Sequence, residues 1–375
     1  MSYFTNHKVY IPKFVTPEVA GVTFGGFEAC KYILSQPNAT AADGSPDVAH
    51  SGAAAAVPGI SRAGLPVWDY ITFPQAMIAC CNMGKGYHLT SAFERASLAF
   101  LSQMYNTMPH GGNSNVNPPT DFTFNTEIGL LDKHLNAEIP TYYRALPGTG
   151  PNTWAHNHMG TGVFDLNGLV YEWCLLMMST NGYARVPGNL DVTYTGSPYG
   201  RGTISDTGGA APTLTCDGST INWLKQWSAD SFNTMSVYIA EAGGGTGALY
   251  TIVDTTATTL ILTNGDNPGN GPATFAIFNT VATDISGGCT SGQKILTLRN
   301  SDANLKAFAI PATTDASGSA VYGSDVFYFD KSAERAAVWG GYFLHALSAG
   351  VFALDLATAP SGSYNSLGFR ACKAL

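Results

Sequence analysis

The chain has 375 residues, enough for two or three domains with a large buried core. Only 12% of its residues are charged, while 42 are glycine and 18 are tyrosine, which is typical of a loop-rich, β-rich fold. The net charge of −8 argues against nucleic acid as a partner, because neutralising phosphates requires basic patches.

The first half of the chain predicts short strands and two helices. A strand over 9–15 is broken by a proline, and a second strand covers 24–32. Thr72 and Pro74 are typical of the first turn of a helix over 73–81. A capping box over 91–94 predicts the start of a helix that continues to about residue 104.

The segment over 162–173 predicts a tight turn between buried apolar residues. Asp165, Asn167 and Gly168 are turn residues, because Asn and Asp side chains satisfy local backbone groups. The positions expected to be buried are Phe164, Leu166, Val170, Tyr171 and Trp173.

Residues 195–305 are rich in Gly, Thr, Ser and Asp with alternating apolar runs, and we interpret them as a β-rich insertion. Cys216 and Cys289 flank one glycine-rich segment of it, and they either form a disulfide or remain free thiols. No stretch approaches the roughly 20 apolar residues of a membrane span, and no secretory signal is visible at the N-terminus.

The last forty-odd residues alternate between two kinds of position. Runs such as 340–341, 349–354 and 367–370 look like an apolar frame. Between them stand chemically unrelated side chains that no core or catalytic set needs. We predict that these residues form a contact surface: Trp339, Tyr342, Phe343, Leu344, His345, Leu347, Asp355, Ala357, Thr358, Gly362, Tyr364, Asn365 and Ser366.

The frame over 335–341, 349–354, 359–361 and 367–370 resembles the variable region of the variable proteins of diversity-generating retroelements. The segments over 24–32, 89–97 and 162–173 also resemble, in order, motifs of that family's C-type lectin domain, which is of the formylglycine-generating-enzyme type. The resemblance covers about 10–185 and 325–375.

This resemblance implies an α+β C-type lectin fold with two helices, short irregular β-sheets and a β-rich insertion. The lectin-like domain would span 1–190 and 310–375, with a variable region over about 338–368 and the insertion at 195–305. Asparagine codons of a template copy would be randomised at the mixed positions, with Asn365 as an unaltered one. In the enzyme relatives, the asparagine matching Asn167 can bind calcium, so a structural calcium is the alternative to a plain turn.

The implied function is binding of a ligand or receptor, as in a tropism determinant or an adhesin. Its target would be an unknown host-surface or environmental protein or glycan. Because a small contact patch binds modestly, we expect a homo-oligomer, located on a virion tail or a cell surface. One alternative is a structural virion component without diversified binding.

A remote alternative is an oxidase of the formylglycine-generating type. Such chemistry needs a cysteine pair near the Gly340–Gly341 motif, and the cysteine near it in this sequence, Cys372, stands alone beyond the last frame segment. We therefore expect that the protein is not an enzyme.

Overall fold

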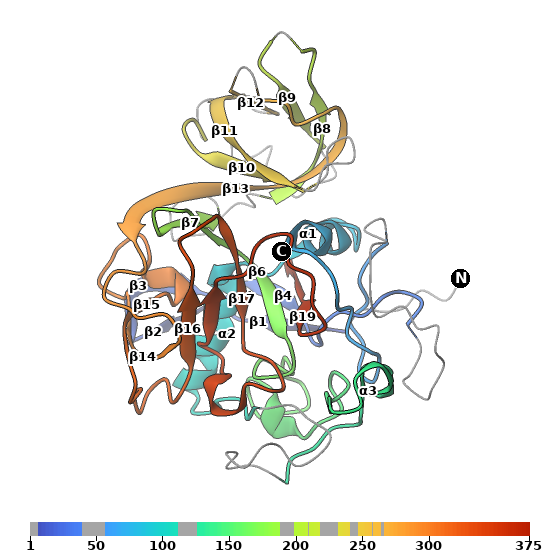
Figure 1. Cartoon of the computed structure of the whole chain (residues 1–375), viewed down its shortest axis with the longest axis vertical. Helices are drawn as coiled ribbons and strands as arrows, with labels where there is room; N and C mark the ends of the chain where they lie inside the picture. The colour runs from blue at the N-terminus through green and yellow to red at the C-terminus, as the bar shows by residue number, and fades with distance from the viewer. Residues whose placement is uncertain are drawn as a thin grey trace.

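The structure, a computed structural model, describes residues 7–39, 57–111, 126–187, 199–208, 210–217, 232–240, 247–256, 258–263 and 266–375 (Figure 1). Its helices are α1 (Phe73–Cys81), α2 (Ala92–Met104) and α3 (Lys133–Glu138), with 3-10 turns η1 (Asn152–Trp154), η3 (Lys306–Phe308) and η4 (Ala346–Ser348). The strands are β1 (Lys8–Ile11), β2 (Phe14–Thr16), β3 (Val19–Phe24), β4 (Phe27–Cys30), β5 (Tyr87–Leu89), β6 (Tyr171–Met178), β7 (Tyr183–Pro187), β8 (Tyr199–Ser205), β9 (Thr213–Cys216), β10 (Ser236–Ile239), β11 (Ala248–Thr255), β12 (Thr259–Leu262), β13 (Gly271–Asp284), β14 (Gln293–Leu298), β15 (Pro311–Asp315), β16 (Val326–Phe329), β17 (Arg335–Trp339), β18 (Leu354–Leu356), β19 (Leu367–Phe369) and β20 (Ala371–Ala374).

The predicted fold class is wrong. The chain is mostly β, with 38% strand and 12% helix. It has a 14-stranded sheet, and six strands of this sheet close into a barrel. The expected α+β lectin fold with two helices and short irregular sheets does not describe this architecture. The short C-terminal strands do not stay separate, because β17 pairs with β6 and β18 joins β17 to β16 in one continuous ladder.

Both predicted helices are confirmed with their caps. The Thr72 side chain accepts from the backbone N–H of Gln75, and the Gln75 side chain accepts in return from the Thr72 N–H. Ser91 and Glu94 form the same reciprocal capping box at α2. Glu94 therefore has a structural role at the start of this helix.

The barrel lies above the rest of the molecule in Figure 1. Its strands follow the order β10, β11, β12, β9, β8 and β13, and pairing of β10 with β13 closes the ring. All of these pairings are antiparallel, and the interior is filled by side chains such as Leu214, Ile252, Leu260, Phe275 and Ile277. The barrel therefore has an apolar core of its own.

Strand β13 connects the barrel to the main body. Its first part pairs with β8 and β10, and its last part, from Phe278 to Asp284, pairs with β7. Strands β7, β6, β17, β18 and β16 follow one another in the main body, and we call them the central sheet. The barrel strands therefore fall within 199–284. Strand β14, which also lies inside the predicted 195–305 insertion, pairs instead with β15 and β16 of the body.

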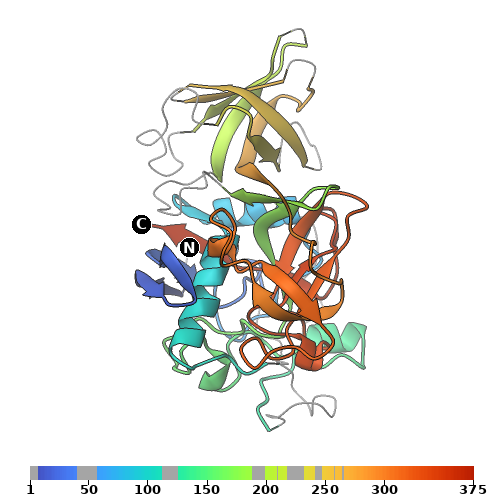
Figure 2. The same ribbon diagram turned by 90° about the vertical axis from the view of Figure 1, so that its left-hand side faces the viewer.

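The central sheet separates two apolar clusters. Helix α2 belongs to the cluster that contains Trp339, Phe352 and Leu354, whereas α1 belongs to the cluster that contains Trp173 and Phe369. Figure 2, turned by 90°, shows α2 running beside the sheet below the barrel. All five apolar side chains predicted to be buried in the 162–173 segment are buried.

The C-terminal strand β20 returns to the N-terminal half and lies between β4 and β5, where Cys372 pairs with Ala29 on one side and His88 on the other. All seven cysteines lie in the described ranges as free thiols. Cys216 and Cys289 are therefore free thiols and do not form a disulfide with each other. Cys216 lies in barrel strand β9, whereas the Cys289 thiol donates a hydrogen bond to the Pro311 carbonyl oxygen in the body.

Candidate functional site

The apolar frame of the C-terminal region is buried, as predicted. Phe352, Leu354 and Phe369 have no exposed surface. The indole N–H of Trp339 donates to the carbonyl oxygen of Val351 at 3.0 Å, which ties β17 to the segment before β18. The frame is therefore a rigid base for the residues between its strands.

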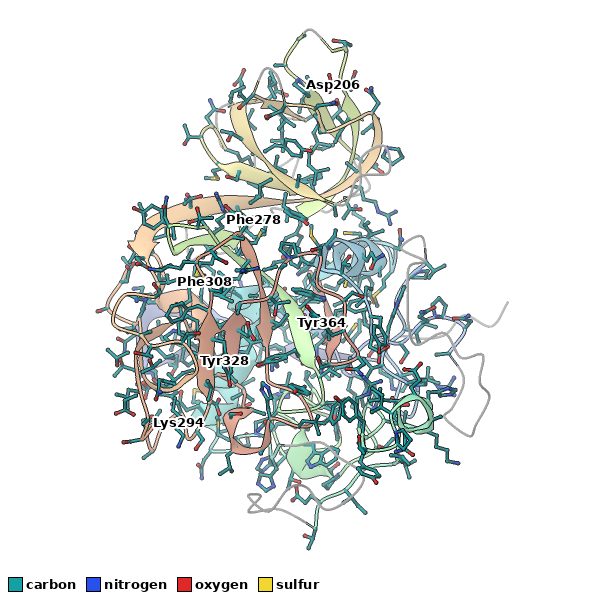
Figure 3. All side chains as sticks on the ribbon, viewed as in Figure 1. Asp206, Phe278, Lys294, Phe308, Tyr328 and Tyr364 are labelled. Atoms are coloured by element: carbon teal, nitrogen blue, oxygen red, sulfur yellow. The ribbon has the colours of Figure 1, made fainter. Side chains whose placement is uncertain are left out.

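Most of the predicted contact positions reach the surface. Leu344, Leu347 and Tyr364 are 39%, 48% and 57% exposed, and Figure 3 shows Tyr364 on the body below the barrel. The remaining positions with partly exposed side chains are Tyr342, His345, Asp355, Ala357, Thr358, Asn365 and Ser366.

Three predicted contact positions are buried instead. Trp339 is 0% exposed, because both faces of β17 are covered and its side chain belongs to the same apolar cluster as α2, and Phe343 is 2% exposed between the rings of Tyr142 and Tyr342. Gly362 is also buried, and a Cβ there would lie 3.0 Å from the carbonyl oxygen of Ala359. Trp339 and Phe343 belong to the core, and a larger residue at Gly362 requires its neighbours to shift.

The structure brings Tyr342, His345 and Asp355 together. The rings of Tyr342 and His345 have centroids 4.2 Å apart. The phenol oxygen of Tyr171 lies 3.2 Å from Nδ1 of His345, and the Tyr171 side chain also hydrogen-bonds to Asp355. Tyr171 therefore joins two predicted contact positions, one at the start of η4 and one in β18.

Burial shifts the pKa values of several side chains in this group. Burial lowers the pKa of His345 to about 4, so its imidazole carries no charge at neutral pH. Burial raises the pKa of the Asp355 carboxyl, whereas hydrogen bonds from the Ala357 N–H and from Tyr171 act in the opposite direction. Burial also raises the pKa of Tyr342.

Sequence reasoning missed three tyrosines that complete the group. Tyr171 was assigned only to the core, and neither Tyr142 nor Tyr328 carried any signal among the 18 tyrosines of the chain. Tyr328 of β16 lies opposite Asp355 of β18 in the parallel register, and its ring centroid is 6.1 Å from that of His345. We call Tyr142, Tyr171, Tyr328, Tyr342, His345 and Asp355 the tyrosine cluster.

A buried ion group holds the loop that carries Tyr364. The Arg144 guanidinium bonds to Asp132 at 2.8 Å and to Asp69 at 2.9 Å, and all three side chains are fully buried. Its Nη1 also donates to the carbonyl oxygen of Asn365 at 2.6 Å. The backbone of this loop is further fixed by the Tyr70 N–H, which donates to the Tyr364 carbonyl oxygen at 3.1 Å.

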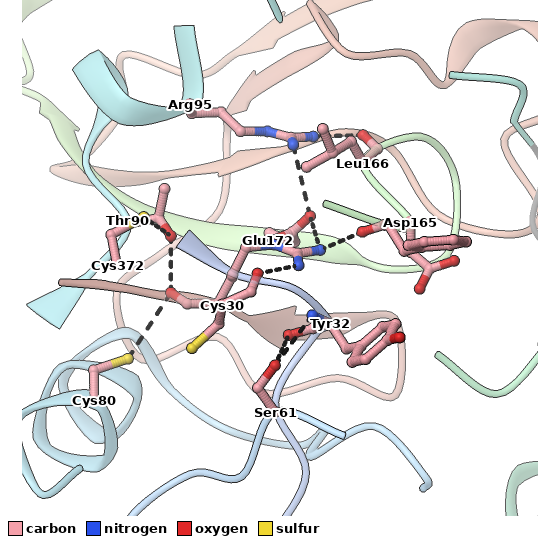
Figure 4. Close-up of polar contacts among 12 residues, drawn as sticks. Cys30, Tyr32, Ser61, Cys80, Thr90, Arg95, Asp165, Leu166, Glu172 and Cys372 are labelled. Atoms are coloured by element: carbon pink, nitrogen blue, oxygen red, sulfur yellow. Dashed lines mark hydrogen bonds and ion pairs between the residues drawn. The ribbon is translucent and has the colours of Figure 1, made fainter. Parts of the chain in front are cut away.

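A second buried network joins the last frame segment to β6. Arg370 donates to Glu172 at 2.8 Å and to the backbone carbonyls of Cys30 and Phe164, also at 2.8 Å. Arg95 of α2 approaches the same Glu172 carboxylate and donates to the Leu166 carbonyl (Figure 4). These contacts hold the segments around β4, α2, β6 and β19 together.

Asn167 lies in the predicted turn, where Asp165 and Gly168 have positive φ angles of 63° and 80°. Its side-chain nitrogen donates to the Pro109 carbonyl at 2.9 Å, whereas Oδ1 has no hydrogen-bond partner within the described ranges. One unpaired oxygen is far from the six to eight that calcium takes, and the described residues contain no cluster of His, Cys, Asp or Glu that could hold a metal. The contacts fit the turn role, and calcium at Asn167 stays an untested prediction.

Cys372, the cysteine considered for oxidase chemistry, is buried in β20 beside Thr90. Burial raises the pKa of its thiol well above the usual value. A thiol held protonated in the core is a poor metal ligand or nucleophile.

No protein-family model matches the chain, and no curated protein matches it either. Across the described ranges, no helix is both long and apolar enough to cross a membrane.

Proposed function

We propose that the protein binds a foreign ligand through the C-terminal surface around the tyrosine cluster, and that a retroelement diversifies this surface. One observation carries the proposal. Tyr342, His345 and Asp355, chosen from the sequence as contact positions, lie together with partly exposed side chains, while Phe352, Leu354 and Phe369 beside them are buried.

The surface suits recognition because its base is rigid. Tyrosines offer large contact area with few rotatable bonds, so less side-chain entropy is lost on binding. The Arg144 group fixes the loop of Asn365, and the indole of Trp339 fixes the frame, so the contact side chains stand on ordered backbone. Substitutions at exposed positions of such a surface change recognition at little cost in stability.

Ligands selected from displayed random peptides and from arrayed oligosaccharides test the binding function. A variant with Tyr342, His345, Asp355 and Tyr364 all replaced by alanine is expected to lose these ligands. Because His345 and Asp355 also bond to Tyr171, its melting temperature is expected to fall, but by less than that of Phe352→Ala, which opens a cavity in the core. Equal binding by the variant would contradict the proposal, and so would a fall in melting temperature as large as that of Phe352→Ala.

Diversification has a separate test in the genome. We expect a nearly identical copy of the coding stretch for Val338–Leu367 beside a reverse-transcriptase gene, differing only at adenines. Absence of this copy would remove the retroelement and leave the binding function standing.

A further inference from the structure

Three members of the tyrosine cluster lie outside the stretch proposed to vary. Tyr171 comes from β6, Tyr328 from β16 and Tyr142 from the segment after α3. Their rings meet the variable stretch at centroid distances of 5.7 Å from Tyr171 to Tyr342, 6.1 Å from Tyr328 to His345 and 5.3 Å from Tyr142 to Phe343. Three separate segments thus place tyrosines against one short loop.

Two polar side chains of the cluster have partners within the protein. The His345 ring has the Tyr171 phenol as a partner, and the Asp355 carboxylate accepts from the Ala357 N–H at 2.6 Å. The side chains that stand out into solvent beside them are Leu344, Leu347 and Tyr364. Burying these side chains against a partner gains free energy from apolar area, with little contribution from charge.

These exposed apolar side chains favour a protein over a sugar as the partner. A glycan presents many hydroxyl groups, and each one that is buried without a hydrogen-bond partner weakens binding. Aliphatic and phenyl side chains of a protein have no polar groups that need hydrogen-bond partners, and they pack well against tyrosine rings and leucines.

Resting on the binding function proposed above, we propose that Tyr142, Tyr171 and Tyr328 form a fixed tyrosine floor beneath the diversified positions. We further propose that the partner is an uncharged protein surface that presents aromatic or aliphatic side chains. Every diversified variant then keeps the same floor, and changes at His345 or Asp355 release the Tyr171 phenol to bond the partner.

The test uses the full chain and the peptides selected from the displayed random library. Tyr328→Ala, and independently Tyr142→Ala, are expected to weaken peptide binding by about tenfold or more, as loss of a central aromatic contact does. Tyr328→Phe keeps the ring and is expected to retain the affinity. Tyr10→Ala is the matched control, since Tyr10 is 55% exposed on β1 and outside the cluster.

The salt dependence of peptide binding gives a second measurement. It reports on charges at the interface, and a purely structural role of the tyrosines would not change it. Raising the ionic strength from about 0.1 M to about 1 M shortens the Debye length from about 10 Å to about 3 Å. We expect the dissociation constant of the selected peptides to change less than about threefold over this range.

The outcomes separate this inference from the binding function. Selection of oligosaccharides alone, selection of no peptide, a steep salt dependence, or unchanged affinity in both floor variants would overturn the tyrosine floor. If the fourfold alanine variant still lost its ligands in those cases, the binding function would stand. If that variant bound as well as the unchanged protein, both proposals would fail.

Discussion

The phenol oxygen of Tyr171 lies 3.2 Å from Nδ1 of His345, although the two residues are 174 positions apart in the sequence. Tyr171 belongs to a buried strand of the central sheet, and His345 belongs to the loop predicted to contact a ligand. This contact attaches the proposed binding surface to the core of the molecule.

The protonation of His345 provides a first prediction. Burial lowers the pKa of its imidazole to about 4, below the value near 6.5 of an unfolded histidine. The unfolded state therefore binds the extra proton first as the pH falls. This group's contribution to stability is full above about pH 6.5 and is lost as the pH falls through about 4. An NMR titration of the ring measures this pKa, and a value at or above 6.5 would contradict the burial of this side chain.

Asp325 provides a prediction of opposite sign. Its carboxylate accepts from the Phe352 N–H at 2.8 Å, and burial raises its pKa to about 8, although this bond and the Arg95 charge act to lower it. The folded state therefore keeps a proton that the unfolded chain releases near pH 3.9. The stability from this group is full below about pH 3.9 and is lost as the pH rises through about 8.

Asp325→Asn imitates the protonated carboxyl and tests this assignment. The free energy of unfolding, from urea denaturation at several pH values, is expected to fall between about pH 4 and pH 8 in the unchanged protein relative to the variant. Parallel curves for the two proteins would show that Asp325 titrates with an ordinary pKa.

Trp339 and Leu344 form a matched pair for mutation, because both were predicted to be contact positions but only Leu344 lies at the surface. Trp339 is fully buried, so Trp339→Ala is expected to cost about 3–5 kcal/mol of unfolding free energy through lost burial and a cavity. Leu344 is 39% exposed, and Leu344→Ala is expected to stay within about 0.5–1 kcal/mol. Chemical denaturation measures both changes, and similar costs for the two would contradict their assignment to core and surface.

The Arg144 group yields a fourth prediction. Arg144→Ala leaves Asp69 and Asp132 buried without their cation, which is expected to cost about 3–5 kcal/mol of unfolding free energy. Urea denaturation measures the loss. Lys331→Ala is the control, since the side chains of Lys331 and its partner Asp284 are 42% and 39% exposed and an exposed pair contributes little. Equal effects would show that the Arg144 group is not a structural anchor.

The sequence by itself determined the features whose causes are local. The cap at Thr72 and the capping box over 91–94 each depend on neighbours within four consecutive residues, and the frame residues Leu354 and Phe369 stand in short apolar runs that must be buried. Both were therefore predicted with the right residues.

Only the tertiary structure decided the fold class and the composition of the site. Whether short strands remain separate or join one ladder depends on hydrogen bonds such as those between β17 and β6, whose residues are far apart in the chain. The same holds for Tyr142 and Tyr328, which reach the variable stretch only in the folded chain, and for Trp339 and Phe343, whose side chains turn inward there. Local patterns carry no information about such distant contacts, because side-chain type and spacing do not specify which strand becomes a neighbour.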